Sequence, residues 1–172
     1  HPDLPKGEYQ LSLRRGERAV YSFCMCPGGT VAAAASEEGG VVTNGMSTYQ
    51  RDGENANAAL VVSVDASDFG ADVFAGVHFQ KQLERLAFAK GGGEYIAPCQ
   101  TAGLFLQGRQ GAQFGAVKPT YPRGVAGGNF DGIFPRQICA MLRDGLAAFD
   151  KRIAGYAAKD ALMTGVETRT SS

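Results

Sequence analysis

The chain of 172 residues contains no tryptophan, only two histidines and no excess of either charge. Seventeen basic residues balance seventeen acidic ones, so no strong electric field would attract nucleic acid or an anionic membrane. Every apolar run falls short of the roughly 20 residues that cross a bilayer, and no signal-peptide pattern is present. We therefore expect a cytoplasmic protein with neither nucleic-acid nor membrane partners.

The motifs of several enzyme classes are also missing. No G-x-G-x-x-G spacing joins a strand to a helix, as dinucleotide-binding folds require, and no carboxylate pair stands out. A catalytic triad would depend on His78, the sole interior histidine, whose position near a helix start is more typical of a packed or surface residue. The cysteines are Cys24, Cys26, Cys99 and Cys139, and a disulfide framework is not expected in a chain this large and cytoplasmic in character. Only Cys24 and Cys26 are close in sequence, which argues against a metal site.

Alternating apolar and polar residues predict antiparallel sheet in the N-terminal third. One hairpin is expected within residues 8–26 and a second within 30–44, with a break at Pro27-Gly28-Gly29 between them. The stretch 44–57 is polar and lacks a hydrophobic period, which indicates a loop. Residues 59–64 are apolar on both faces, which predicts a central, covered strand.

The middle of the chain carries helical patterns. A helix is expected from Gly76 to the glycines at 91–93, with Phe79, Leu83, Leu86 and Ala87 on one face and Lys81, Glu84 and Arg85 turned away from it. Pro98 is expected to open a short helix to about residue 107. Pro135 is expected to open the best helix, whose apolar stripe consists of Ile138, Leu142, Leu146, Phe149 and Ile153.

The final stretch, 161–170, is typical of a strand and is expected to return to the N-terminal sheet. The predicted fold class is therefore α+β, a mostly antiparallel sheet with a helical block inserted between strands. We expect residues 1–172 to form a single domain cut from a longer protein. Its β part would be 8–66 plus 160–172, and its helical part 74–157.

Several uncommon sequence blocks occur in an order that resembles one protein family. They are YSFCMCPGG at 21–29, VTNGMS at 42–47, RDG at 51–53, NANAAL at 55–60 and GVETRTSS at 165–172, with shorter matches at 76–80, 91–93 and 97–100. Together they resemble the uncharacterised FAD-dependent, or NAD(FAD)-utilising, dehydrogenases of bacteria and plastids. The resemblance implies that FAD-binding Rossmann elements lie before and after this region, and that FAD is held by the longer protein and not by this chain alone. It leaves NAD(P) open as a second cofactor.

The resemblance also implies a function for the chain as the insert or substrate-binding domain of an oxidoreductase. This domain would cover the reactive face of the flavin and position a small-molecule substrate, with the flavin-binding domain of the same protein as its partner. The residues expected to face substrate or cofactor are Met25, Pro27, Gly28, Gly29, Asn44, Gly45, Met46, Arg51, Asn55, Asn57, Glu167, Thr168, Arg169 and Thr170. The alternative is a self-contained binding or regulatory module without a redox role.

Several of these residues keep two interpretations. Cys24 and Cys26 are weak catalytic candidates: either two buried small residues or a thiol pair that exchanges electrons with the flavin. Gly28 and Gly29 form either a tight turn or a flat surface for a ring or phosphate, and the asparagines are either turn formers or ligands. Arg51 and Arg169 are either surface residues or a joint anchor for an anionic group, the latter if the final strand rejoins the N-terminal sheet.

Overall fold

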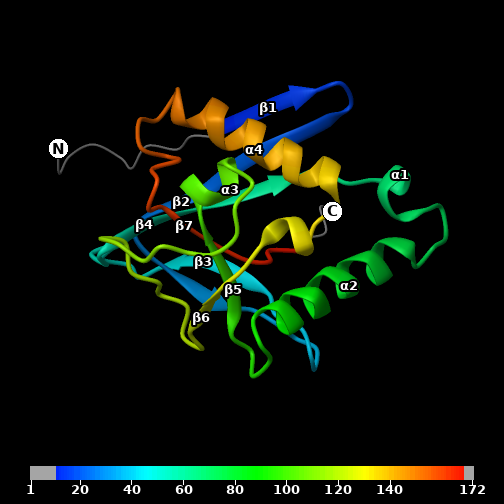
Figure 1. The fold of residues 1–172 in the computed structure, drawn as a ribbon, viewed down its shortest axis with the longest axis horizontal. Helices are drawn as coiled ribbons and strands as arrows, with labels where there is room; N and C mark the ends of the chain where they lie inside the picture. Colours follow the sequence, from blue (N-terminus) through cyan, green and yellow to red (C-terminus); the bar gives the residue numbers. More distant parts are fainter. Residues whose placement is uncertain (1–10, 169–172) are drawn as a thin grey trace.

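The fold is that of a computed structural model, which describes residues 11–168 (Figure 1). Its elements are β1 (Leu11–Arg15), β2 (Arg18–Ala33), β3 (Thr43–Ser47), β4 (Asn55–Val62), α1 (Ala66–Phe69), α2 (Ala75–Lys90), β5 (Ala97–Thr101), α3 (Ala102–Leu106), β6 (Val125–Gly127), a 3-10 turn at Phe130–Gly132, α4 (Arg136–Asp150) and β7 (Leu162–Thr164). The predicted α+β class is confirmed. Within the described residues, no helix combines the length and the apolar character that a membrane span needs.

The first sheet is built on β2, its longest strand. β2 pairs antiparallel with β1 at its start, with β3 at its end, and with β4 along most of its length, so the two predicted hairpins are confirmed. The predicted break at Pro27-Gly28-Gly29 is wrong, because β2 continues through it with register shifts between Phe23 and Cys26 and between Cys26 and Gly29. Such bulges let a strand bend without turning back. β4 is not central as predicted, since among the described strands it pairs only with β2.

A second, smaller sheet has β5 between parallel β6 and antiparallel β7. The short helix predicted over 98–107 is present as α3, but it starts at Ala102, and Pro98 lies inside β5. The prediction for the last strand is wrong, because it pairs with β5 instead of returning to the first sheet. All five residues of β5 are buried, so its sequence shows no alternation that would distinguish it from a helix. Pro98 is tolerated because its neighbours make the backbone bonds on the β6 side, from the Ala97 N–H to the Gly124 carbonyl at 3.1 Å and from the Gly128 N–H to the Cys99 carbonyl at 2.7 Å. The Pro98 carbonyl still accepts from the Gly165 N–H at 3.2 Å. The range 74–157 thus holds β5 and β6 as well as helices.

The two long helices form as predicted, and α4 packs against β1, β2 and β4 (Figure 1). The apolar stripe of α4 is buried from Ile138 to Phe149, which confirms the predicted face. The helix approaches the sheet closely at Gly145, where an added Cβ would lie 2.7 Å from Cγ2 of Val20. Glycine at this position therefore sets the distance between helix and sheet.

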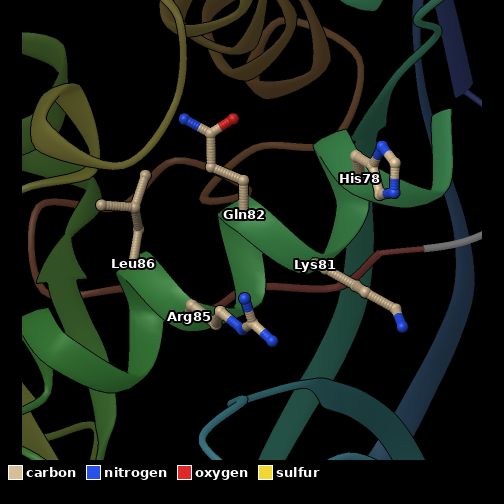
Figure 2. Close-up of a pocket in the computed structure, with 5 residues that line it drawn as sticks. All are labelled: His78, Lys81, Gln82, Arg85 and Leu86. Carbon is tan, nitrogen blue, oxygen red and sulfur yellow. The ribbon is translucent and has the colours of Figure 1, made fainter. Parts of the chain in front are cut away.

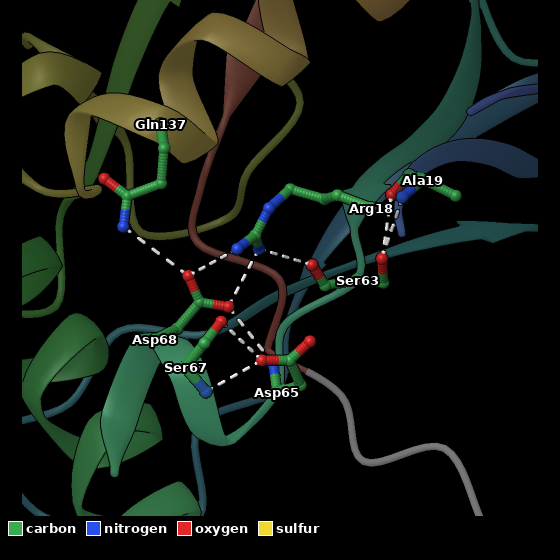
Figure 3. Close-up of polar contacts among 7 residues, drawn as sticks. All are labelled: Arg18, Ala19, Ser63, Asp65, Ser67, Asp68 and Gln137. Atoms are coloured by element: carbon green, nitrogen blue, oxygen red, sulfur yellow. Dashed lines mark hydrogen bonds and ion pairs between the residues drawn. The ribbon is translucent and has the colours of Figure 1, made fainter. Parts of the chain in front are cut away.

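A partly buried ion pair joins β2 to α1 (Figure 3). Arg18 donates from Nη1 and Nη2 to Oδ2 and Oδ1 of Asp68 at 2.8 and 2.7 Å, and from Nη1 to the Ser63 carbonyl at 2.8 Å. The side chain of Asp68 is 1% exposed and that of Arg18 is 19% exposed. Asp68 also completes the capping box of α1 with Asp65, and it accepts from Nε2 of Gln137 on α4 at 3.5 Å. One carboxylate thus connects β2, α1 and α4.

Replacement of this carboxylate should weaken the fold in a pH-dependent way. Burial raises the pKa of Asp68, but hydrogen bonds from Arg18 and from the Asp65 backbone outweigh it and hold the pKa below its usual value. Because the folded pKa is the lower one, the stabilisation is complete above the unfolded pKa of about 4 and is lost as pH falls through the folded value. We expect Asp68→Asn to lower the free energy of unfolding by about 2–3 kcal/mol at neutral pH, and by less in strong acid, in urea titrations.

The surface pair between Arg15 and Asp144 provides the control. These side chains are 60% and 53% exposed and their charged atoms are 3.6 Å apart. Asp144→Asn should change the free energy of unfolding by less than about 1 kcal/mol. Equal losses for the two variants would show that the Arg18–Asp68 pair has no special role.

Candidate functional site

The structure brings glycines and an asparagine of the family-like blocks together where β2, β3 and β4 meet. At the centre, Nδ2 of Asn57 on β4 donates to the carbonyls of Thr30 and Met46 at 2.7 and 3.1 Å. An ideal Cβ on Gly29 would lie 2.4 Å from Asn57 Nδ2, and one on Gly45 would lie 3.1 Å from Asn57 Oδ1. The two glycines therefore make room for this amide.

The loop between β3 and β4 folds back onto Gly28. Gly28 has a φ of 62°, and a Cβ on it would lie 2.1 Å from the carbonyl carbon and oxygen of Arg51. Gly53 is also close to Gly28, since a Cβ added to Gly53 would lie 2.8 Å from the Gly28 carbonyl oxygen. Arg51 itself has a φ of 54°, and its N–H donates to the Thr48 carbonyl at 3.2 Å. Only glycine fits at position 28, and the loop backbone is fixed there.

The expected polar loop over 44–57 is much shorter in the structure. Asn44, Gly45 and Met46 lie on β3, and Asn55 and Asn57 lie on β4. The loop is thus confined to 48–54. The strand residues on either side were not predicted because their backbone pairs with β2 without any hydrophobic alternation in the sequence. Nδ2 of Asn55 donates to the Lys118 carbonyl at 2.8 Å, which ties the long 107–124 segment to this end of the sheet.

Met25 and Pro27, the other predicted residues on β2, differ in exposure. Met25 is half-buried and Pro27 is exposed. Large side chains also reach the surface from β3 and the loop, where Met46 is 51% exposed and Tyr49 is 95% exposed. This end of the sheet therefore presents both polar and apolar groups to its surroundings.

The C-terminal block lies beside β3. The N–H of Thr43 donates to the Val166 carbonyl at 2.8 Å, and its Oγ1 donates to the Thr164 carbonyl at 3.3 Å. Val166 is fully buried in the same core cluster as Val41. Two blocks more than 100 residues apart in sequence are therefore neighbours. We call residues 25–29, 44–57 and 165–168 together the motif face.

Two residues predicted to contribute to the site, Arg169 and Thr170, lie outside the described residues. The shared anchor formed by Arg51 and Arg169 therefore stays a prediction. Glu167 and Thr168 are described, and both are half-buried.

Glu84 on α2 holds the C-terminal block in place. Its Oε1 accepts hydrogen bonds from Oγ1 of Thr168 at 2.5 Å and from Nε2 of Gln80 at 3.0 Å. Its backbone carbonyl accepts from the Val41 N–H at 3.1 Å. Glu84 is 7% exposed, so its predicted position on the outer helix face is wrong. The side chain can be buried because two hydrogen-bond donors satisfy its carboxylate. The position of Glu84 next to Leu83, on the apolar side of the helix, is the sequence signal that could have indicated its burial.

The cysteines give little support to redox chemistry in the described part of the chain. Cys26 is a free, half-buried thiol, whereas the side chain of Cys24 lies outside the description, so the thiol-pair interpretation remains a hypothesis. Burial raises the pKa of Cys99 to about 11 and that of Cys139 to about 12, which keeps both protonated at neutral pH. Residues 11–168 contain no group of three or more side chains that could hold a metal ion.

His78 is exposed on α2, where it lines a hollow together with the other side chains that Figure 2 labels. The hollow measures about 370 Å³ and is lined by His78, Lys81, Gln82, Arg85 and Leu86. Nζ of Lys81 pairs with Glu37 at 2.9 Å. The exposed position of His78 agrees with its interpretation as a surface residue.

Comparison with known proteins identifies the class to which this domain belongs. An uncharacterised protein of Clostridium beijerinckii is 47% identical over 175 residues, which cover 100% of this chain and 33% of that protein. The chain thus spans a third of the length of this relative. Residues 1–170 match the family model described as "FAD-dependent protein, C-terminal domain-like". The chain belongs to this family, which confirms the resemblance found in its sequence blocks.

The glycines of the described residues lack the surroundings of a dinucleotide-binding loop. Arg51 and Asn57 fill the space into which a Cβ on Gly28 or Gly29 would project, so no pyrophosphate can enter there. The three glycines at 91–93 follow the end of α2 and do not precede a helix. The glycines of the motif face therefore serve internal packing.

Removal of the Glu84 carboxylate should release the C-terminal block. Glu84→Ala leaves Thr168 and Gln80 without their acceptor, so we expect a loss of about 2–3 kcal/mol in the free energy of unfolding. Glu84→Gln keeps an acceptor oxygen and should cost about half as much. Hydrogen exchange read by mass spectrometry should accelerate over residues 162–168 in Glu84→Ala. The exposed Glu38 supplies the control, and exchange no faster than in Glu38→Ala would refute this role.

Proposed function

We propose that this chain is the substrate-binding or insert domain of a FAD-dependent oxidoreductase, a dehydrogenase, and that its motif face covers the reactive face of the flavin. The observation that carries the proposal is the hydrogen bonding of Thr43 to Val166 and Thr164, which joins the N-terminal and C-terminal blocks into one face. The family match and the greater length of the relative support it. The partners are then the flavin-binding domain of the same polypeptide and a small-molecule substrate.

In this proposal the chain contributes positioning. When bound to the longer protein, FAD would supply the redox chemistry, and this domain would hold a substrate at the cofactor. Arg51 is the residue we assign to an anionic group of the substrate, because a guanidinium matches carboxylate and phosphate geometry. Its backbone is fixed against Gly28, so the side chain starts from a defined position. A well-positioned substrate reacts faster because less entropy is lost on the way to the transition state.

Other expectations remain predictions within this proposal. The cytoplasmic location and the lack of nucleic-acid and membrane partners rest on composition. Neither the family match nor the described residues support NAD(P), which is not part of the proposal. A self-contained module without a redox role is less well supported, because the family description names FAD and the relative is three times the length of the matched part.

Replacement of Arg51 in the longer protein should separate positioning from cofactor binding. We expect Arg51→Ala to leave the FAD content unchanged and to slow flavin reduction by about tenfold or more, which corresponds to about 1.4 kcal/mol of transition-state stabilisation. The measurement is stopped-flow flavin reduction with a panel of small carboxylates and phosphate esters. FAD content is read from absorbance after denaturation.

Arg14 on β1 is an exposed arginine outside the motif face and provides the matched control. The flavin of the Arg14→Ala variant should be reduced at the wild-type rate. A longer protein that purifies without FAD would contradict the proposed function. Equal rates for Arg51→Ala and Arg14→Ala would contradict the role of Arg51 alone.

A further inference from the structure

We propose that the corner between α1 and α2 is the surface through which this domain docks onto the rest of its own polypeptide. The inference rests on the proposed function for the nature of that partner, the flavin-binding part. The corner is defined as residues 69–79. It lies outside the motif face, so its role can be tested separately.

The corner exposes large apolar side chains. Val73 is 89% exposed, Phe74 is 63% exposed and Val77 is 45% exposed. Eight large hydrophobic side chains are exposed among the described residues, and these three all lie within residues 73–77. Removal of apolar surface from water is favourable by about 25 cal/mol per Å². Such a concentration on one corner is typical of an interaction site.

Hydrogen bonds and ring contacts fix the shape of the corner. Oδ1 of Asp72 accepts from the Phe74 N–H at 2.9 Å, and the Asp72 carbonyl accepts from the Ala75 N–H at 3.0 Å. Behind them, the rings of Phe69 and Phe79 lie 5.9 Å apart. α1 is itself held to β2 by the Arg18–Asp68 pair (Figure 3). A surface that is already ordered loses little conformational entropy when it binds.

A hollow of about 550 Å³ adjoins the apolar side chains. Its lining combines apolar and polar side chains: Phe69, Ala75 and Phe79 with Asp68, Asp72, His78 and Gln82. His78 and Gln82 are exposed side chains of α2, and both are labelled in Figure 2. Protein interfaces likewise combine apolar and polar side chains.

The occupant we assign is the remaining polypeptide of the longer protein. The relative matches this chain over its whole length, yet that match is only 33% of the relative, so such a domain occurs with twice as much polypeptide attached. A partner in the same chain is present at high effective concentration, so a small apolar surface suffices to dock it.

Thiol labelling of the longer protein tests this docking. Phe74→Cys and Phe114→Cys replace the same residue type at positions that are 63% and 52% exposed in the domain. Each variant is treated with a maleimide in buffer and in urea, and the labelled peptide is identified by mass spectrometry to exclude the native cysteines. We expect Phe74→Cys to be labelled about tenfold or more slowly in buffer than in urea, and Phe114→Cys at similar rates in both. The protection should persist after about hundredfold dilution.

Three results would overturn the inference. Free labelling of Phe74→Cys would show that the corner is open in the longer protein. Protection that disappears on dilution would identify a second copy as the occupant. Equal protection at position 114 would indicate general shielding. The FAD content of the same samples tests the proposed function independently, because an FAD-containing protein with an open corner would contradict only the docking.

Discussion

The buried carboxylate of Glu84 is the contact on which the arrangement of the motif face depends. A buried carboxylate is costly unless donors satisfy it, and here Thr168 and Gln80 do so while the backbone of the same residue receives the Val41 N–H. One helical residue thereby connects the chain just before β3 with the C-terminal block. The hydrogen bonds of Thr43 then join those two segments directly. Blocks that are distant in sequence become one face because α2 offers both of them partners.

Periodicity predicted the parts of the fold that are half-buried and local. The β1–β2 hairpin, α2 and α4 each have one wet and one dry face, so their patterns repeat at the period of the element. The parts of the fold that were predicted wrongly lack such a pattern. β5 is buried on both faces, and the pairing of β7 with β5 is a long-range choice that local residues do not encode. The bulges around Gly28 likewise depend on a loop that packs there from residue 51.

The role of the predicted site residues toward substrate or cofactor stays a prediction, and the contacts that individual residues make within the motif face could not be predicted from the sequence. The blocks indicated which segments belong together, but Gly28, Gly29 and Gly45 prove to be required by contacts with Arg51 and Asn57. Glu84 was missed because a charged residue in an amphipathic helix is assigned to water by default. The α1–α2 corner was missed because the sequence does not show which apolar residues a fold leaves exposed.

The central claim is that the motif face lies against the flavin of the longer protein, and amide hydrogen exchange tests it most directly. Exchange would be measured in that protein before removal of FAD, after removal and after FAD is restored. The account predicts slower exchange over residues 48–54 whenever FAD is present, with no change over α4 (Arg136–Asp150), because only the motif face would be covered. Exchange over 48–54 that is the same with and without FAD would contradict the account.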